Sequence, residues 1–499
     1  MSDLASKMPS MQEDISVVLA SNRGPFSFIR TSDGLKKKGA AGGASPALDA
    51  VARRLGDRAF WVATAISDAD REAVASGQAE KLSADLGYGF RLLTFDPETY
   101  SGYYNEVSNR MLWYANHCLW DEVGIKSDDL AQDAFEDAYE PVNRAFAAEV
   151  AEHVTQGALV LFQDYHLATA PAHLRAARPD AAISHFTHSS FCGPPGMAYL
   201  PESTRRAVIE GMLGADLVGF HVGPWVEGFF RSCEELGATV DRRLGAVDHD
   251  DRRTWVRAYP IPIDAQDLLA RARSETVVDW ARRFSEWADG RVLIVRGDRA
   301  EPSKNIVRGF EALGLVLEHR TDLRDRVRFA ACVYPSRQGL EEYRAYVARI
   351  KDAAAAVNAR FPGTIELYMN DDFDRTLGAY RVYDVLLVNP IMDGMNLVSK
   401  EGPALNERDG VLVLSEGAGA YAQLGRHSVG IKDPFDVQEA AMALERAIDL
   451  PADERREKAA ALRKLATASK PGEWIEAQID DLTEVAAGRE PTTPAASVV

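Results

Sequence analysis

Short apolar runs alternate with longer, helix-length segments along most of the chain. Most of the runs are rich in Val, Ile and Leu and lack polar alternation, as expected of parallel strands buried on both faces. The runs are Ile15–Ser21, Ala158–Gln163, Ile183–Thr187, Leu217–Phe220, Val292–Val295, Arg328–Val333, Ile365–Met369, Val385–Asn389 and Val411–Leu414. Between them lie Ala/Arg/Glu-rich segments such as Pro46–Leu55, Val142–His153 and Gly339–Ala359. Repeated strand–helix units predict doubly wound α/β domains.

The length of 499 residues exceeds what one compact core normally holds, so two large domains are expected. A boundary is predicted at Ala258–Asp264, where two prolines follow a polar stretch and a fresh strand begins at Val292. We therefore expect one Rossmann-like domain over residues 14–263 and a second over 264–465. The tail from Arg489, REPTTPAASVV, has the composition of a disordered segment.

The chain is acidic, with 57 basic against 75 acidic residues and a formal net charge of −18. Such a surface disfavours nucleic acid and anionic membranes as partners, and an anionic substrate would need its own basic pocket. No apolar run approaches a membrane span, and the N-terminus lacks the apolar core of a signal peptide, so we expect a cytoplasmic protein. The four cysteines, without CxxC spacing, are expected to be isolated, reduced thiols.

Basic residues follow two neighbouring predicted strands. The segment RGDRAEPSKN comes directly after RVLIV and carries Arg299 and Lys304, and YPSR ends the next strand with Arg337. Two cations at a strand's carboxyl end can hold a diphosphate, Arg by its planar fork and Lys as a point charge. The alternative is a solvated loop in which Asp298 and Glu301 neutralise both cations.

The segment NPIMDGMNLVSKEG is the most specific in the chain. An apolar strand ends at Asn389, a glycine-containing turn follows, and a helix is expected to begin within Leu397–Glu401. The amides of the turn can hold phosphate oxygens, and Glu401 can accept hydrogen bonds from ribose hydroxyls. The alternative is a capped helix start with Asn396 as the cap.

Three further segments carry candidate groups. In AAGGASPALDA, Gly42 and Gly43 precede a helix and either let backbone amides approach a phosphate or serve an ordinary tight loop. QDYHL and HFTHSSF end strands and offer Asp164 and His188 as acid, base or hydroxyl-binding groups. His185 beside His188 suggests a metal, but no third ligand stands nearby, so no metal is expected.

Two other patterns have competing interpretations. The aromatic residues of YYNEVSNRMLW can stack on a sugar face or fill the core. DFDRT, at Asp372–Thr376, has the DxDxT pattern of aspartyl-phosphate phosphatases. Its aspartates stand several residues beyond the strand, and a helical segment follows, so a solvated turn and helix cap is the preferred interpretation.

As an ordered set, SNRGP, DYHL, FCGP, GMLGADLVGFH, SKN, YPSR, DGMNLVSKE and VLVLSEGAGA resemble the trehalose-6-phosphate synthase family of glycosyltransferases, family 20. The resemblance runs from about Ser16 to about Asp481 and is closest to the actinobacterial-type sequences. It implies a GT-B fold, with two Rossmann-like doubly wound parallel-sheet domains facing a central cleft. It also implies a C-terminal helix, residues 466–488, that returns to the N-terminal domain, ahead of the tail at 489–499.

The resemblance assigns roles to residues that match the family's motifs. The implied acceptor-binding residues are Arg23, Tyr104, Trp113, Asp164 and Arg337. The implied donor-binding residues are Gly42, Gly43, Arg299, Lys304, Met395, Asn396, Leu397, Val398 and Glu401. The implied catalytic residues are Arg299, Lys304, Asp393 and His188, of which His188 bonds the transferred glucose. No metal or other cofactor is implied, because the nucleoside diphosphate glucose is a substrate.

The implied reaction is transfer of glucose, with retention, from UDP- or GDP-glucose to glucose 6-phosphate, giving trehalose 6-phosphate. The partners are then these small molecules, with a homo-oligomer possible. One departure concerns the acceptor: the family's GWSG is replaced by WVATAISDADRE at Trp61–Glu72. The first loop reads GAAGGAS where many members have GGLA. Alternatives are transfer to another phosphorylated acceptor, including C–N coupling of a pseudo-sugar, and an inactive sugar-phosphate-sensing module.

Overall fold

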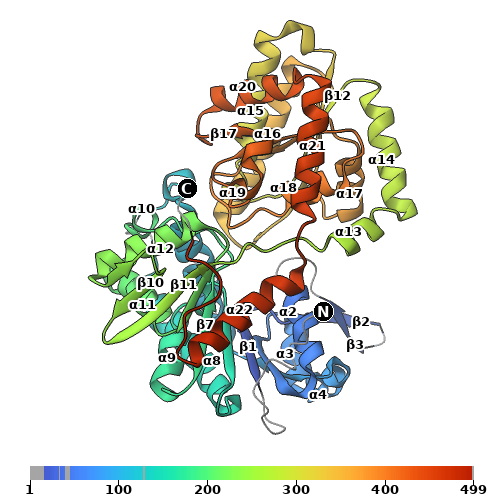
Figure 1. Ribbon diagram of the computed structural model, residues 1–499. Helices are drawn as coiled ribbons and strands as arrows, with labels where there is room; N and C mark the ends of the chain where they lie inside the picture. The colour runs from blue at the N-terminus through green and yellow to red at the C-terminus, as the bar shows by residue number, and fades with distance from the viewer. Residues whose placement is uncertain (1–15, 33, 40–44, 127–129, 497–499) are drawn as a thin grey trace. The chain divides into compact units, whose positions relative to one another are not determined.

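The computed structural model describes residues 16–32, 34–39, 45–126 and 130–496. The chain divides into two compact units, each built from a largely parallel sheet and helices, so the α/β fold class is confirmed (Figure 1). Unit 1 comprises Met1–Trp120, Ile125–Ile261 and Pro471–Val499, and unit 2 comprises Asp121–Gly124 and Pro262–Lys470. The sequence-based boundary after residue 263 lies two residues beyond this division.

Unit 1 holds a nine-stranded sheet in the order β5-β4-β1-β6-β7-β8-β11-β10-β9. The first seven strands in this order are parallel, and β10 and β9 add an antiparallel edge. The strands are β1 Val17–Ser21, β4 Ala59–Thr64, β5 Gly89–Leu93, β6 Leu159–Gln163, β7 Ala182–Phe186, β8 Leu217–Phe220, β9 Thr239–Asp241, β10 Ala246–His249 and β11 Arg252–Ala258. A separate antiparallel hairpin joins β2 Phe26–Thr31 to β3 Gly34–Gly39.

The helices of unit 1 include α22, from the far end of the chain, which contacts α2 and β7 (Figure 1). They are α2 Ser45–Leu55, α3 Asp68–Ala75, α4 Gln78–Ser83, α5 Pro97–Ser101, α6 Trp113–His117, α8 Glu140–His153, α9 Ala170–Ala177, α10 Pro194–Met197, α11 Glu202–Leu213, α12 Gly223–Leu236 and α22 Pro471–Ala486. The short helix α7, Trp120–Val123, stands where the chain passes between the units. The segments Gly102–Leu112 and Phe135–Tyr139 are π-helical.

Unit 2 holds a six-stranded parallel sheet in the order β14-β13-β12-β15-β16-β17. The strands are β12 Val292–Arg299, β13 Val327–Tyr334, β14 Ile365–Tyr368, β15 Val385–Val388, β16 Val411–Ser415 and β17 Val429–Ile431. Because both faces are covered by helices, β15 (VLLV) and β16 (VLVLS) are buried apolar runs and β12 begins with VLIV, which is the pattern that predicted them; β12 then continues with the buried Arg296 and Asp298. The spatial order is that of the dinucleotide-binding fold.

The helices of unit 2 bury their apolar faces against this sheet. They are α13 Ala265–Arg271, α14 Glu275–Ala288, α15 Ile306–His319, α16 Glu341–Arg360, α17 Phe373–Val382, α18 Val398–Leu405, α19 Tyr421–Leu424, α20 Val437–Ile448 and α21 Ala452–Ala466. The buried residues of α15, α16 and α20 form one apolar cluster with those of the strands. No helix in the described ranges combines the length and the apolar character that a membrane span requires.

The C-terminal tail is more ordered than its composition predicts. The buried carboxylate of Asp481 on α22 accepts hydrogen bonds from Thr492 N at 2.7 Å and Thr493 N at 3.0 Å, and from the hydroxyl of Tyr259 at 2.7 Å. Arg257 Nε donates to Thr493 O at 2.7 Å. The prediction of a disordered tail is therefore wrong for residues 489–496, because a buried charge on the preceding helix binds the tail's backbone.

The cysteines also differ from expectation. Cys118 and Cys192, 74 residues apart in the sequence, form a disulfide, whereas Cys233 and Cys332 are free and buried. The prediction of four isolated thiols is wrong for the first pair. The pairing follows from the tertiary fold: the loop after β7 lies against α6, where Cys192 N donates to Asn116 O at 3.3 Å.

Candidate active site

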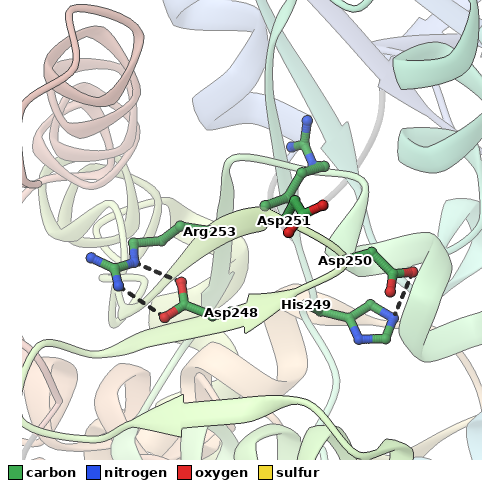
Figure 2. A pocket seen from close by; sticks show the side chains of 6 residues that line it. Asp248, His249, Asp250, Asp251 and Arg253 are labelled. Carbon is green, nitrogen blue, oxygen red and sulfur yellow. Dashed lines mark hydrogen bonds and ion pairs between the residues drawn. The ribbon is translucent and has the colours of Figure 1, made fainter.

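A surface hollow of about 540 Å³ lies at the tip of the β10–β11 hairpin and is lined by residues 248–253 (Figure 2). Two pairs form within it: Arg253 Nε donates to Asp248 Oδ1 at 2.8 Å, and His249 Nε2 lies 3.5 Å from Asp250 Oδ2, whereas Arg252 Nη2 donates to Asp216 Oδ1 at 3.1 Å, outside the lining. None of the residues that the sequence predicts for the site lines this hollow. The candidate site is therefore sought at the strand ends.

Unit 2 reverses its strand order between β12 and β15, and the segments after these two strands carry the predicted donor-binding residues. β12 ends at Arg299, and Lys304 completes the 3-10 turn before α15. β15 ends at Val388, and the loop to α18 contains Asp393 and Asn396. Ligands of doubly wound sheets bind outside the carboxyl ends of the strands at such a reversal. The topology therefore brings the two segments to one place.

Lys304 and Asp393, 89 residues apart in the sequence, form an ion pair between Nζ and Oδ2. Asn396 Nδ2 donates to the same carboxylate oxygen at 3.1 Å. Burial alone would lower the pKa of Lys304, but Asp393 and Asp298 raise it above its usual value, so the side chain is an ammonium ion. The pair is a cation with a hydrogen-bonded carboxylate beside it, which suits a sugar joined to a phosphate.

Glu301 is a buried carboxylate that interacts electrostatically with Arg299 and Arg337. Glu301 Oε1 lies 3.3 Å from Arg299 Nε and accepts a hydrogen bond from Ser336 Oγ at 2.8 Å. Burial would raise the pKa of Glu301, but Arg299, Arg337 and Lys304 lower it to about 2, so the carboxylate stays ionised. The side chain of Arg299 is 52% exposed and can reach a ligand.

The alternative interpretation, in which Asp298 and Glu301 neutralise Arg299 and Lys304, holds only in part. Asp298 is fully engaged by the buried Arg296, whose Nη2 donates to Asp298 Oδ2 at 2.8 Å and to Lys304 O at 2.9 Å. Asp298 thus anchors the backbone of the turn through Arg296. Glu301 pairs with Arg299 but leaves half of that side chain exposed.

The loop before α18 combines a cap with a ligand-binding arrangement. Asn396 has a positive φ of 67°, and its Oδ1 accepts a hydrogen bond from Ser399 N at 3.2 Å in the first turn of α18, but the N-cap residue is Leu397 rather than the predicted Asn396. Met395 is buried, whereas Leu397, Val398 and Glu401 are partly exposed at the helix start. Helix N-termini attract anions, which agrees with a phosphate near Leu397 and Val398.

The carboxyl group of Glu401 is expected to make the stability of the folded protein depend on pH. Although the residue is partly exposed, desolvation by the surrounding protein raises the pKa of its carboxyl group to about 7 from the usual 4.5. Since the folded protein binds this proton more tightly than the unfolded chain, the resulting stabilisation is complete below pH 4.5 and is lost as the pH rises through 7. We expect Glu401→Gln to abolish this loss, so that between pH 5 and pH 8 its melting temperature falls about 5 °C less than that of the unmodified protein.

Thermal melts at these two pH values measure the effect. The control is Glu341→Gln on α16, which replaces an exposed carboxylate and leaves the pH dependence as it is. Equal pH dependence in the Glu401→Gln variant and the unmodified protein would show that the Glu401 carboxyl group does not titrate near neutrality.

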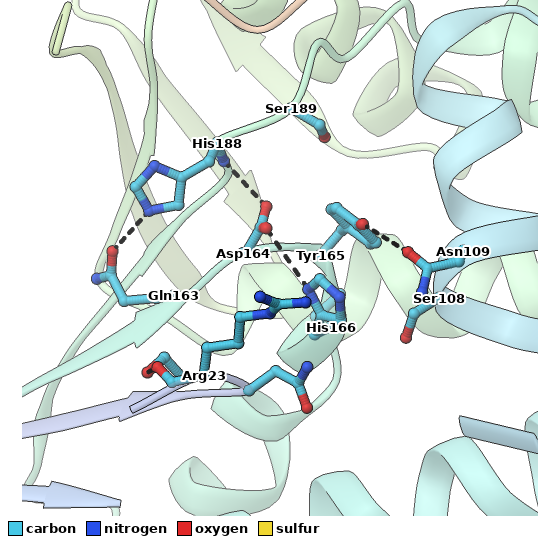
Figure 3. A network of polar contacts seen from close by, with 12 residues as sticks. Arg23, Ser108, Asn109, Gln163, Asp164, Tyr165, His166, His188 and Ser189 are labelled. Atoms are coloured by element: carbon cyan, nitrogen blue, oxygen red, sulfur yellow. Dashed lines mark hydrogen bonds and ion pairs between the residues drawn. The ribbon is translucent and has the colours of Figure 1, made fainter. Parts of the chain in front are cut away.

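Unit 1 reverses its strand order between β1 and β6, and two predicted acceptor-binding residues, Arg23 and Asp164, and the predicted catalytic residue His188 follow β1, β6 and β7 (Figure 3). Arg23 stands two residues after β1, Asp164 directly after β6, and His188 two residues after β7. Asp164 has a positive φ of 75°, which turns its carboxylate toward its neighbours: Oδ1 accepts a hydrogen bond from His188 N at 3.1 Å. The motif residues of this unit therefore also meet at a reversal point.

Histidines surround the carboxylate of Asp164. His166 Nδ1 lies 3.5 Å from Oδ2, and the backbone carbonyl of Asp164 is 3.2 Å from His185 Nε2. Burial would raise the pKa of Asp164, but its contacts with His166 and His188 keep it well below the usual range. Burial lowers the pKa of His185 to about 4 and also lowers that of His188, so both rings are neutral at physiological pH.

The aromatic residues divide between the two interpretations. Tyr104 accepts a hydrogen bond from Arg23 Nη2 at 3.4 Å and stacks on Tyr100 and His166, with ring centroids 5.5 and 5.8 Å away. Trp113 is only 8% exposed and packs on His117. Tyr104 therefore belongs to the polar cluster of Arg23, and Trp113 is largely core. Gly42 and Gly43 lie outside the described residues, and Arg337 belongs to unit 2.

The model of glycosyltransferase family 20 matches residues 15–484. The chain belongs to this family. Among curated relatives, the family-20 chain is 31% identical over 443 residues to validamine 7-phosphate valienyltransferase of Streptomyces hygroscopicus subsp. jinggangensis (87% of each chain). It is 32% identical over 496 residues to trehalose-6-phosphate synthase of a Mycobacterium species, strain KMS (96% and 97% of the chains).

The fold of this family-20 chain is also that of a solved relative. An alpha,alpha-trehalose-phosphate synthase (UDP-forming) from Burkholderia xenovorans, in complex with glucose-6-phosphate, superposes with a TM-score of 0.77 at 24% identity, covering 94% of this chain and 99% of the other. The GT-B fold predicted from the resemblance is therefore confirmed. The family match spans nearly the same residues as the motifs that predicted it.

Proposed function

We propose that the chain is a retaining glucosyltransferase that makes α,α-trehalose 6-phosphate from a nucleoside diphosphate glucose and glucose 6-phosphate. The observation that carries the proposal is the Lys304–Asp393 ion pair beside Arg299, at the point where the sheet of unit 2 reverses its strand order. An ammonium, a guanidinium and a hydrogen-bonded carboxylate are the groups that a sugar diphosphate requires. The relatives named as trehalose-6-phosphate synthases support the same reaction.

In the proposed mechanism, charge develops on the departing diphosphate as its bond to the anomeric carbon breaks. Arg299 and Lys304 stabilise this charge, and such preorganised groups are the largest single contribution in many enzymes. The acceptor hydroxyl attacks the same face of the sugar and passes its proton to the leaving diphosphate, so no carboxylate acts as nucleophile. Asp393 and His188 bond hydroxyls of the transferred glucose, and Arg23 binds the acceptor phosphate. We propose that this chemistry proceeds without a metal ion.

A second candidate function is coupling of a pseudo-sugar to validamine 7-phosphate, which the named activity of the Streptomyces relative supports. The observation in its favour is the replaced GWSG segment. Trp61, the nearest tryptophan, is fully buried and donates from Nε1 to Ser21 Oγ at 2.8 Å, so it does not replace a tryptophan that contacts sugars. Both candidate functions use a phosphorylated acceptor.

Product analysis separates the two. The purified chain is incubated with glucose 6-phosphate and UDP-, GDP- or ADP-glucose, and the product is identified by NMR and mass spectrometry. We expect trehalose 6-phosphate with both anomeric carbons in the α configuration, and one of the three donors to be preferred. No product from glucose 6-phosphate, together with turnover of validamine 7-phosphate, would establish the second function. No turnover of either would indicate an inactive module.

A further inference from the structure

Gln163 is the last residue of β6, and its buried side-chain amide is hydrogen-bonded to the ring of His188 (Figure 3). Its side chain is 3% exposed, and its Oε1 lies 2.9 Å from His188 Nε2. Its Nε2 has no hydrogen-bond partner among the residues that the structure describes. An amide that is half satisfied in a protein interior is unfavourable unless a ligand completes it.

The ring of His188 is held on its other sides. Phe186 lies 4.8 Å, His221 5.5 Å and Trp474 5.7 Å from it, measured between ring centroids. Its backbone N–H donates to Asp164 Oδ1. Trp474 comes from α22, so the returning C-terminal helix forms part of this ring cluster. With its ring fixed and neutral, His188 carries one ring proton, and the partner of Nε2 decides where that proton lies.

We propose that Gln163 is a positioning residue for His188 and also donates a hydrogen bond to a hydroxyl of the transferred sugar. Its Oε1 is an acceptor only, which places the ring proton of His188 on Nε2 and leaves Nδ1 as an acceptor. Its Nε2 then offers two donors beside a ring that bonds the same sugar. A sugar hydroxyl completes the amide, whereas a sugar that lacks this hydroxyl leaves it unpaired, so Gln163 also selects among donors. The sugar contact rests on the proposed function, but the placement of the ring proton does not.

The ring proton is observed directly by NMR of the full-length protein labelled with [15N]histidine and free of substrates. The chain has 10 histidines, and His188→Asn identifies the signal. We expect a protonated Nε2 and an unprotonated Nδ1 in the unmodified protein, and a mixture of tautomers in Gln163→Leu. A predominant Nδ1–H tautomer, or a Gln163→Leu spectrum like that of the unmodified protein, would overturn the proposal whatever the substrates are.

Kinetics test the sugar contact. Gln163→Leu is expected to lower kcat/KM for the sugar donor about tenfold and to change KM for glucose 6-phosphate about twofold or less. The control is Ser184→Ala on β7, which removes a buried hydroxyl bonded to Val160 O at 3.4 Å and is expected to leave kcat/KM unchanged. An unchanged kcat/KM in Gln163→Leu would overturn the sugar contact.

Gln163→Glu keeps the size of the side chain and gives a second readout. The groups around His188 are then Asp164, His166, His185, His221 and the new carboxylate. The added charge favours a doubly protonated ring, so we expect the pKa of His188 to rise and the acid limb of the kcat/KM profile to move to higher pH. A ring that titrates as in the unmodified protein would show that Gln163 does not hold it.

Discussion

Replacing Lys304 by alanine is expected to slow glucosyl transfer about a hundredfold or more while leaving the fold intact. Lys304 Nζ pairs with Asp393 Oδ2, and its side chain is 12% exposed, so the ammonium is desolvated and its field acts at close range. Near a protein surface, a cation at roughly 4 Å from a unit negative charge contributes about 4 kcal/mol. The charge on the departing diphosphate grows during the reaction, so the loss falls mainly on kcat.

Steady-state kinetics with glucose 6-phosphate and the preferred nucleoside diphosphate glucose measure this loss, and a thermal melt checks the fold. The matched control is Lys351→Ala, which removes an exposed lysine from α16 in the same unit. Its kcat is expected to equal that of the unmodified protein. A Lys304→Ala variant that turns over at a normal rate would refute the assignment of Lys304 to the diphosphate.

The parallel strands could be predicted because burial on both faces makes each of them a continuous apolar run. Each of the nine predicted runs overlaps a strand, and β8 spans the predicted Leu217–Phe220. Several strands that the apolar pattern does not predict carry polar residues: β3 reads GLKKKG, and β9 to β11 lie within or beside the polar stretch Asp241–Arg253. An edge strand or hairpin faces water, and its sequence therefore lacks the apolar signal. β4, AFWVAT, and β17, VGI, are apolar and are missed as well.

The candidate site also has a part that the sequence predicts and a part that only the fold reveals. Arg299, Lys304, Asp393 and Glu401 follow strands in a motif with fixed spacing, so the sequence locates them. The ion pair between Lys304 and Asp393 joins residues 89 positions apart and follows from the strand order, which no local pattern contains. Gln163 stands in the QDYHL motif, but nothing in the sequence marks it as functional, because only the geometry shows its amide beside His188.

The contacts of the C-terminal segment could not be predicted from the local sequence for a related reason. Trp474 lies beside His188, from a helix 286 residues later in the chain. The tail after α22 is polar and proline-containing, and its order depends on the buried carboxylate of Asp481. Composition reports whether a segment can form its own core, and it does not report whether an existing core offers a partner.

Arg23→Ala is expected to raise KM for glucose 6-phosphate about a hundredfold and to leave KM for the sugar donor unchanged. Arg23 follows β1, is exposed, and donates from Nη2 to Tyr104 Oη at 3.4 Å, so its guanidinium is oriented and accessible to a phosphate. A charge-assisted hydrogen bond contributes about 1.5–3 kcal/mol, and a guanidinium can make two such bonds to one phosphate. Lysine supplies the charge without the fork, so Arg23→Lys is expected to recover only part of the loss.

The selectivity between glucose 6-phosphate and glucose isolates the contribution of the phosphate. In the unmodified protein kcat/KM is expected to favour the phosphorylated sugar strongly, and Arg23→Ala is expected to reduce this ratio about a hundredfold, because glucose never made the lost contact. Arg30→Ala serves as the control. It removes an exposed arginine of the β2–β3 hairpin that pairs with Glu72 of α3, and it should keep the ratio. An unchanged selectivity ratio in Arg23→Ala would show that other cations bind the acceptor phosphate, and Arg337 is the first of these to test.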